Sequence, residues 1–254
     1  MNADDFSLIA AVNNDEILAG CLARSPDVVS GRLNLTVIRG ARCMAEAYNE
    51  GLATTRAKYA LMAHQDVYLP QGWLDIAMEK IAALNVAHPD WMVAGPYGVR
   101  KDGSHIGRVW DVGIGRELGT VGFAPTPIVS LDELLLILRR DCDYRFDETL
   151  PDFHLYGTDL VQTGLQMGRS AWAIEIPVVH NSQPVATLNG GYTQAYRFMV
   201  KKWAKALPIP TTVASVTRNP IPLALEKWRR RHIPARKGRL LADSVEVARL
   251  ARYE

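Results

Sequence analysis

The stretch Tyr59-Ala-Leu-Met-Ala-His64-Gln-Asp66-Val-Tyr68-Leu-Pro70 decides the fold. Its first five residues are apolar enough to predict a strand buried on both faces, as in a parallel sheet. Three polar residues follow at once, and Pro70 cannot donate to a strand ladder. Open α/β sheets bind ligands at the carboxyl ends of their strands, so the pattern predicts that Asp66 faces a ligand there. The alternative is an ordinary polar strand end in a loop.

The residues around this stretch carry a family resemblance. The segment from Asn49-Glu-Gly51 through His64-Gln65-Asp66 to Gly72-Trp73-Leu74 resembles the centre of GT-A glycosyltransferases of the family-2 type. A second block, from Phe146-Asp147-Glu148 to His180-Asn-Ser182, resembles the later part of a subgroup whose metal turn keeps only its last acid. The two blocks stand in the family's order, and the likeness covers roughly residues 6 to 183.

The resemblance implies a GT-A fold, which is an α/β three-layer sandwich with a mixed, mainly parallel sheet. It also implies a hexosyltransferase-type enzyme of polysaccharide biosynthesis. Such an enzyme moves a sugar from a nucleotide-diphosphate sugar, by family frequency a UDP-sugar, to the hydroxyl of a glycan or lipid-linked acceptor, with inversion. A divalent metal, Mn²⁺ or Mg²⁺, neutralises the leaving diphosphate in this chemistry. The expected metal ligands are Asp66 and His180, which ends a predicted strand that starts at Ala171, with His64 as a substitute ligand.

The expected nucleotide-sugar site lies at strand ends and on one helix. A strand is predicted over 6–12 and a helix over 16–24, and a second helix over 41–53 carries Asn49. Asn13 and Asp15 also have a simpler interpretation as residues that only cap the first helix, and Asn49 as a solvent-facing residue. The resemblance assigns the following residues to this site: Asn13, Asp15, Asn49, His64, Gln65 and Asp66.

Three residues are expected on the acceptor side. Asp132 and Glu133 stand between two predicted strand segments, and they either lie by the acceptor or only decorate a hairpin turn. Trp110 stands within a glycine-rich polar segment from Gly98 to Thr120 and is able to stack on a sugar ring, although an isolated Trp is more often a core residue.

The general base is expected at Asp159, with Asp152 as the second choice. The resembled family often has two acids here, as Tyr-Asp-x-Asp, and Gly157 stands at the first of them. The other interpretation of Asp159 is structural, because an acid in the first turn of a helix accepts backbone N–H bonds.

The composition is that of a globular enzyme. Hydrophobic residues make up 48% of the chain and charged residues 22%, which excludes disorder throughout. Cys21, Cys43 and Cys142 lack metal-type spacing and are expected to be buried thiols of a reducing compartment. The acidic N-terminus differs from a signal peptide, and no apolar run reaches the ~20 residues of a membrane span. We therefore expect a cytoplasmic protein.

The charge is unevenly distributed. Between Arg197 and Arg239, twelve Lys or Arg residues stand against one acid, Glu226. We predict a glycosyltransferase domain over 1–195 and a basic helical extension over 196–254, with Trp203 and Trp228 among the cations. This composition suits peripheral contact with an anionic membrane, at its inner face, or with an acidic partner. The other interpretation is a solvated helical face, and no nucleic-acid partner is expected because no binding motif accompanies the charge.

Two other functions stay open. A non-catalytic nucleotide-sugar-binding or scaffold protein of the same fold is favoured by the missing first acid of the metal turn and by Gly157. A nucleotidyltransferase would need a basic phosphate-binding loop after the first strand, where this chain has Asn13-Asn14-Asp15.

Overall fold

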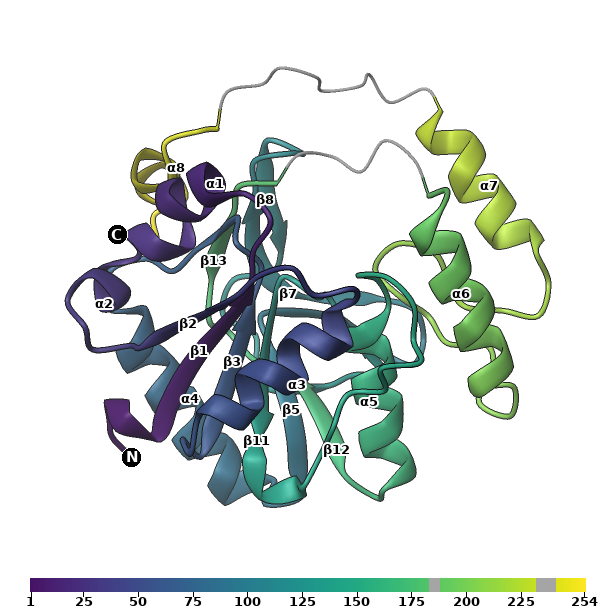
Figure 1. Cartoon of the computed structure of the whole chain (residues 1–254), viewed down its shortest axis with the longest axis horizontal. Coiled ribbons are helices and arrows are strands. Elements are labelled where there is room, and N and C mark those ends of the chain that lie inside the picture. Colours follow the sequence, from purple (N-terminus) through teal and green to yellow (C-terminus); the bar gives the residue numbers. More distant parts are fainter. Residues whose placement is uncertain (183–187, 232–240) are drawn as a thin grey trace.

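A seven-stranded mixed sheet forms the middle of the molecule in the computed structural model, which describes residues 1–182, 188–231 and 241–254 (Figure 1). β1, β2 and β3 are mutually parallel, and β12 is parallel to β5. β11 runs antiparallel between β3 and β5, and β9 is antiparallel to β12. The predicted α/β class with a mixed, mainly parallel sheet is confirmed. In spatial order the strands are β2 (Leu35–Ile38), β1 (Phe6–Ala11), β3 (Tyr59–Ala63), β11 (Leu135–Arg139), β5 (Trp91–Gly95), β12 (Ser170–Ala173) and β9 (Thr126–Pro127).

A smaller sheet carries the later strand ends. The sequence predicts one strand from Ala171 to His180, but the structure divides it between the two sheets. Pro177 stands at the break and has no N–H for a ladder bond. β13 then pairs in parallel with β7 and places His180 opposite Asp111. In spatial order this sheet contains β10 (Ser130–Leu131), β6 (Tyr97–Val99), β7 (His105–Asp111), β13 (Val178–His180) and β4 (Val67–Tyr68), with β8 (Arg116–Gly119) paired to β7.

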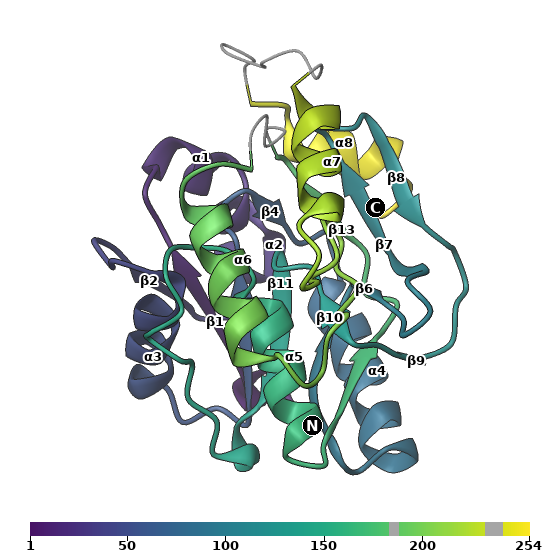
Figure 2. The ribbon, with the colours of Figure 1, turned by 90° about the vertical axis from the view of Figure 1, so that its right-hand side faces the viewer.

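Helices cover both faces of the main sheet (Figures 1 and 2). Side chains alternate along each strand, so Ile9 and Met62 pack with α3 and α5, whereas Leu8 and Leu61 pack with α4. This alternation produces the three layers. The first face carries α3 (Met44–Thr54), α5 (Tyr156–Gln166) and α6 (Gly191–Lys202); the second carries α4 (Trp73–Ala87), α1 (Asp15–Gly20) and α2 (Pro26–Val29). Three short 3₁₀ turns are η1 (Ala3–Asp5), η2 (Leu22–Arg24) and η3 (Arg140–Cys142).

The predicted domain boundary after residue 195 falls inside α6. Tyr196 and Trp203 of this helix are buried in the same core as α3 and α5. Near the chain's last described residues, α8 (Ser244–Leu250) packs Val247 against Tyr68 of β4. The segment expected as an extension therefore shares the core of the main fold. α7 (Ile221–Arg230) lies on the outer side of α6 (Figure 1).

Two further features can be compared with the sequence analysis, namely the state of the cysteines and the presence of a helix able to span a membrane. The three cysteines are free and buried, as expected. No helix in the described part of the chain combines the length and the apolar character that a bilayer crossing requires.

Candidate functional site

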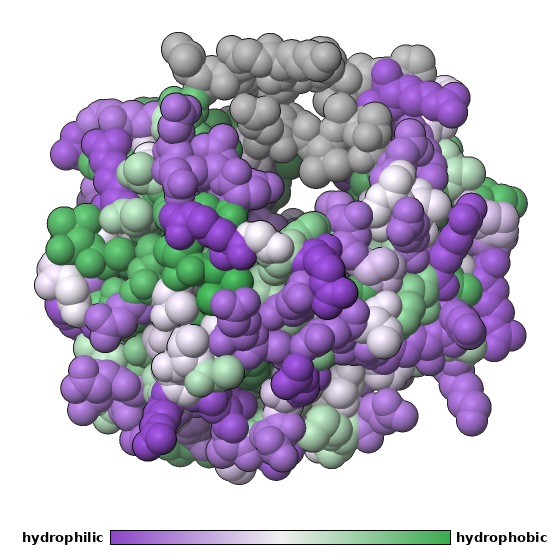
Figure 3. Space-filling view, viewed as in Figure 1, coloured by the Kyte–Doolittle hydropathy of each residue, from purple (hydrophilic) through white to green (hydrophobic). Residues whose placement is uncertain are grey.

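The strand ends predicted to carry the site line one cavity of about 690 Å³. β1, β2 and β3 reach it with their carboxyl ends, and β11 reaches it with its start because it pairs Leu135 with Ala63 of β3 in antiparallel register. The same register lets the His64 N–H donate to the Leu134 carbonyl at 3.0 Å. The surface is hollowed between the side of α1 and the side of α7 (Figure 3). Small-molecule sites typically have about 300–1,000 Å³.

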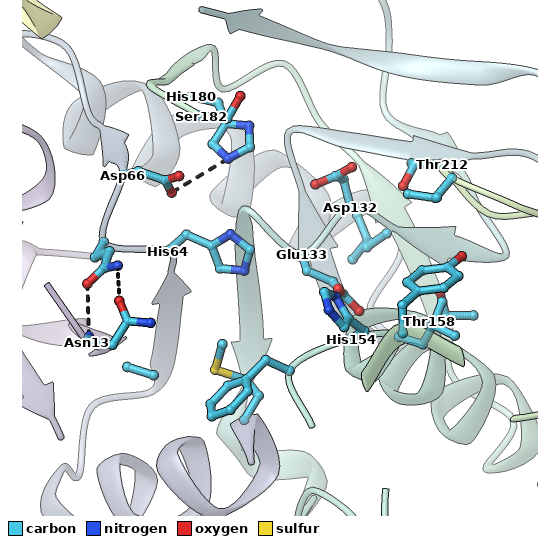
Figure 4. Close-up of a pocket in the computed structure, with 18 of the residues that line it drawn as sticks. Asn13, His64, Asp66, Asp132, Glu133, His154, Thr158, His180, Ser182 and Thr212 are labelled. Atoms are coloured by element: carbon cyan, nitrogen blue, oxygen red, sulfur yellow. Dashed lines mark hydrogen bonds and ion pairs between the residues drawn. The ribbon is translucent and has the colours of Figure 1, made fainter. Parts of the chain in front are cut away.

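The cavity brings together seven of the predicted residues, namely Asn13, His64, Gln65, Asp66, Asp132, Glu133 and His180. Five of them form two groups, with His64, Asp66 and His180 at one end and Asp132 and Glu133 on the side of His154 (Figure 4). Gln65 joins β1 to β3, because its amide donates to Asn13 Oδ1 at 2.6 Å while its Oε1 accepts the Asn13 N–H at 3.0 Å. Seven of the twelve residues that the resemblance named therefore line this cavity.

Three side chains at the first end form a candidate metal centre. His64, Asp66 and His180 each offer one ligand atom, and these atoms lie within 4.8 Å of one another. His180 Nε2 lies 3.6 Å from Asp66 Oδ1, and the Asn181 N–H donates to the Asp66 carbonyl at 2.8 Å. Two imidazoles and one carboxylate suit a divalent transition metal. The residues present therefore fit such an ion.

Each histidine is held through its outer nitrogen. His180 Nδ1–H donates to Asp111 Oδ2 at 3.1 Å, so Nε2 is the atom that faces Asp66. The Tyr156 hydroxyl lies 2.7 Å from His64 Nε2 and donates its only proton to the Glu133 carbonyl at 3.1 Å. Because the carbonyl oxygen is only an acceptor, we assign the hydroxyl proton to that bond and Nε2–H to His64, which leaves the lone pair on Nδ1. Outer partners of this kind orient metal-binding histidines.

The charges at this end support one another. Burial by itself raises the pKa of Asp66, but the neighbouring His180 outweighs it, and the net effect is a lowered pKa. Burial likewise opposes the charged form of His180, yet Asp66 and Asp111 raise the pKa of this imidazole well above its ordinary value. Burial lowers the pKa of His64, which favours the neutral imidazole that binds metals.

Glu133 supplies a carboxylate to the start of α5. Its Oε1 accepts the Gly157 N–H at 3.1 Å, and burial raises its pKa well above the ordinary value. A Cβ on Gly157 would lie 3.0 Å from Glu133 Cγ and 3.2 Å from the Leu131 carbonyl oxygen. The glycine thus makes room for an acid that arrives from the neighbouring strand.

The loop before α5 holds two residues in the left-handed region. Asp152 has φ 67° and Leu155 has φ 64°, values that are uncommon outside glycine. Between them, Phe153 and His154 line the cavity. Residues with such strained backbone conformations cluster at ligand sites. Burial lowers the pKa of His154, so this imidazole stays neutral.

The two acids predicted as the base lie elsewhere. Asp159 accepts hydrogen bonds from Lys202 Nζ at 2.9 Å and from Trp203 Nε1 at 2.7 Å, so its carboxylate joins α5 to α6. The Asp152 carboxylate lies so close to Gly191 that a Cβ there would overlap Oδ2. Neither acid is among the described residues that line the cavity.

Three other predicted residues also lie outside the cavity lining of the described chain. Asp15 is exposed and pairs with Arg39 at 2.5 Å. Asn49 is buried and bonds both the N–H and the carbonyl of Phe146, so it ties α3 to that loop. Trp110 packs in the small apolar cluster beneath α8.

Several residues of the site were not predicted. Asp111 had only a weak signal, because it follows the apolar pair Val109-Trp110 at the end of a strand that also contains His105 and Arg108. Tyr156 stands at the tyrosine of the Tyr-Asp-x-Asp pattern, but that pattern did not indicate a contact of its hydroxyl with His64. Thr212 and Arg230 line the cavity from the α6–α7 segment, which only the tertiary fold brings there.

Comparisons with known proteins agree in part with this arrangement. Residues 7–82 match the family model described as "Glycosyltransferase like family". The chain is 29% identical over 170 residues to a Fuscovulum blasticum protein described as "ATP synthase subunits region ORF 6". That alignment covers 63% of this chain and 66% of the relative, so the chain spans just under two thirds of the relative's length.

Three solved structures of similar shape have TM-scores below 0.5. S. aureus TarS 1–349 in complex with UDP-GlcNAc has a TM-score of 0.48 at 17% identity, covering 82% of this chain and 67% of that one. The mannosyltransferase PcManGT from Pyrobaculum calidifontis, in complex with GDP-Man and Mn²⁺, has 0.47 at 13% identity, covering 97% and 73%. GalNAc-T7 with UDP, GalNAc and Mn²⁺ has 0.49 at 11% identity, covering 80% and 51%.

Proposed function

We propose that this protein is a metal-dependent glycosyltransferase of the GT-A type that moves a sugar from a nucleotide-diphosphate sugar to an acceptor hydroxyl. The observation that carries the proposal is the His64, Asp66 and His180 group in a cavity at the carboxyl edge of the sheet. The glycosyltransferase-like family model supports it over the segment that contains the first two residues. The proposal includes a UDP-hexose donor and inversion at the anomeric carbon. It also includes a glycan or lipid-linked acceptor in polysaccharide synthesis and a place at the inner face of a membrane.

We propose that His64 Nδ1, Asp66 and His180 Nε2 hold the metal, and that His180 releases its Nε2 proton when the ion binds. Nitrogen donors favour Mn²⁺ over Mg²⁺, which prefers oxygen ligands. When bound, the ion neutralises the charge that develops on the leaving diphosphate. The chain itself prepares this end, because Asp111 and the Tyr156 hydroxyl fix both imidazole orientations before a ligand arrives. Asn13 and Gln65, at the adjoining strand ends, are the proposed contacts to the nucleoside.

We place the general base at Asp132 in preference to Asp159 or Asp152. Asp132 lines the cavity, and its Oδ1 accepts the Leu134 N–H at 3.2 Å, which holds the carboxylate at the start of β11. Burial favours the protonated form of the neighbouring Glu133, which cannot accept a proton. In the proposed step, Asp132 takes the proton of the acceptor hydroxyl as its oxygen attacks the anomeric carbon and the diphosphate leaves.

The test combines binding with turnover. We expect UDP and Mn²⁺ together to raise Tm in the wild type, and Asp66→Ala to lose the metal-dependent part. Asp132→Asn should keep this shift while lowering sugar transfer and donor hydrolysis by about 10²–10⁴-fold. Asp159→Asn is the matched control, because the same change is made outside the cavity.

Each alternative has a distinct result. Stabilisation by donors without any turnover under these conditions would indicate a non-catalytic binding protein. The absence of stabilisation by a panel of nucleotide diphosphates and their sugars would contradict nucleotide-sugar chemistry altogether. Equal activity of Asp132→Asn and Asp159→Asn would remove Asp132 as the base.

A further inference from the structure

Helix α7 exposes its apolar side. Ile221, Leu225 and Trp228 are exposed by 65%, 43% and 56%, and Ala224 is exposed beside them. These positions follow the i, i+3, i+4, i+7 spacing of a single helix face. The apolar face of an amphipathic helix normally packs against the protein core, whereas on α7 most of this face is exposed to solvent. We refer to these four residues as the outer stripe.

One polar contact and one apolar residue tie α7 to the fold. Lys227 Nζ donates to Thr193 Oγ1 of α6 at 2.7 Å, whereas Arg230 Nε donates to Glu226 Oε1 at 2.9 Å within α7 itself. Leu223 is the apolar residue of α7 that is buried in the main core. The Lys227 bond and the buried Leu223 fix the rotation of the helix, and the exposed fractions place the outer stripe on its solvent side.

The charge around the outer stripe is positive. Arg229 and Arg231 are exposed at the carboxyl end of α7, and three more cations follow in the sequence at positions 236, 237 and 239, outside the described residues. The acid of the helix, Glu226, pairs with Arg229 and Arg230. An apolar helix face with an interfacial tryptophan and flanking cations fits a lipid surface with anionic headgroups.

We infer that α7 is a membrane-docking helix that inserts its outer stripe at the surface of an anionic bilayer. A convex stripe on one short helix suits insertion among headgroups, whereas a protein partner would have to supply a complementary groove. Arg230, at the end of the same helix, lines the cavity. Docking would therefore bring the cavity to the lipid surface, and, if the proposed transferase function holds, the acceptor would be one presented there.

The experiment measures co-sedimentation with vesicles, without nucleotide or metal, so that it does not depend on the transferase function. We expect binding to vesicles of phosphatidylglycerol and phosphatidylcholine at low salt, and much weaker binding to phosphatidylcholine alone. Leu225→Glu should weaken binding about tenfold or more, because it places a charge in the inserted stripe. Val86→Glu on α4, an 86% exposed apolar residue given the same charge change, should bind as the wild type does.

Both variants should keep the wild-type Tm and donor hydrolysis, since neither residue is in the cavity or in a core. Wild-type protein that ignores anionic vesicles at low salt would overturn the inference. So would equal binding by Leu225→Glu and Val86→Glu, which would indicate adsorption through charge alone. Concentration-dependent dimers lost in Leu225→Glu, without vesicle binding, would assign the outer stripe to self-association instead.

Discussion

The Tyr156 hydroxyl offers a direct test of how the candidate metal centre is built. It accepts from His64 Nε2 at 2.7 Å and donates to the Glu133 carbonyl at 3.1 Å. Burial raises the pKa of this hydroxyl well above its usual value, so it keeps its proton. Tyr156→Phe removes both hydrogen bonds without changing the ring that packs in the core. We expect this change to weaken metal binding.

The magnitude follows from the position of the bond. Tyr156 is 1% exposed, so no bulk water replaces the lost acceptor, and an unpaired buried N–H costs about 1–3 kcal/mol. His64 escapes that cost by moving its proton to Nδ1, and Nδ1 is then no longer able to bind a metal. Loss of an outer partner of a ligand histidine typically lowers metal affinity by about 10–100-fold. We expect the Kd for Mn²⁺ to rise by that factor.

The assay is calorimetric titration of Mn²⁺ into protein saturated with UDP. Tyr144→Phe is the matched control, because it removes a buried hydroxyl that has no hydrogen-bond partner in the described structure and lies outside the cavity lining. The reasoning is refuted if Tyr156→Phe binds Mn²⁺ with the same Kd as the Tyr144→Phe control and the wild type. It is equally refuted if the wild type binds no Mn²⁺ under these conditions.

Three other changes have expected outcomes. Burial raises the folded-state pKa of Glu133, so the wild type should lose stability as pH rises above ~4.3, the ordinary pKa of the unfolded state. Glu133→Gln should remove that loss. An equal change of Tm with pH in the wild type and the variant, from pH ~5 to ~8, would contradict this. Asp159→Asn should leave turnover unchanged and lower the free energy of unfolding by about 1–3 kcal/mol, as Lys202 keeps another carboxylate partner; a large fall in turnover at unchanged Tm would return the base to Asp159. Asn181→Ala should cost about 1–3 kcal/mol in urea unfolding, because its buried amide bonds Ser244 of α8 at 3.0 Å; an unchanged midpoint would show that this bond contributes nothing.

The α/β fold and half of the site were predictable because they rest on local patterns. An apolar strand followed by polar residues marks the sheet edge, and this signal located His64, Gln65 and Asp66 correctly in the cavity. Asp111, the partner of His180, was not predicted, because the strand before it also contains His105 and Arg108. The signal at His64, Gln65 and Asp66 does not depend on distant parts of the chain.

The remainder depends on side-chain direction and on tertiary packing. Asp159 stands at the predicted helix start, but its side chain bonds Lys202 of α6 and Trp203 just after it. No local pattern indicates that these two residues lie there. The basic composition after residue 196 indicated an appendage, whereas the buried Tyr196 joins α6 to the main core. Charge patterns describe surfaces, and they do not reveal which face of a helix is buried.

The close approach of Gly157 to Glu133 has a consequence for the evolution of this fold. Two positions 24 residues apart share the space for one carboxylate beside α5. A side chain at 157 would require both Glu133 Cγ and the Leu131 carbonyl to give way by a few tenths of an ångström. Gly157→Asp should therefore lower Tm, and adding Glu133→Gly should restore only the part of that loss that comes from Glu133, because the Leu131 carbonyl stays in place. A lineage that moves an acid from the strand to the helix is thus expected to shorten the residue at 133 first.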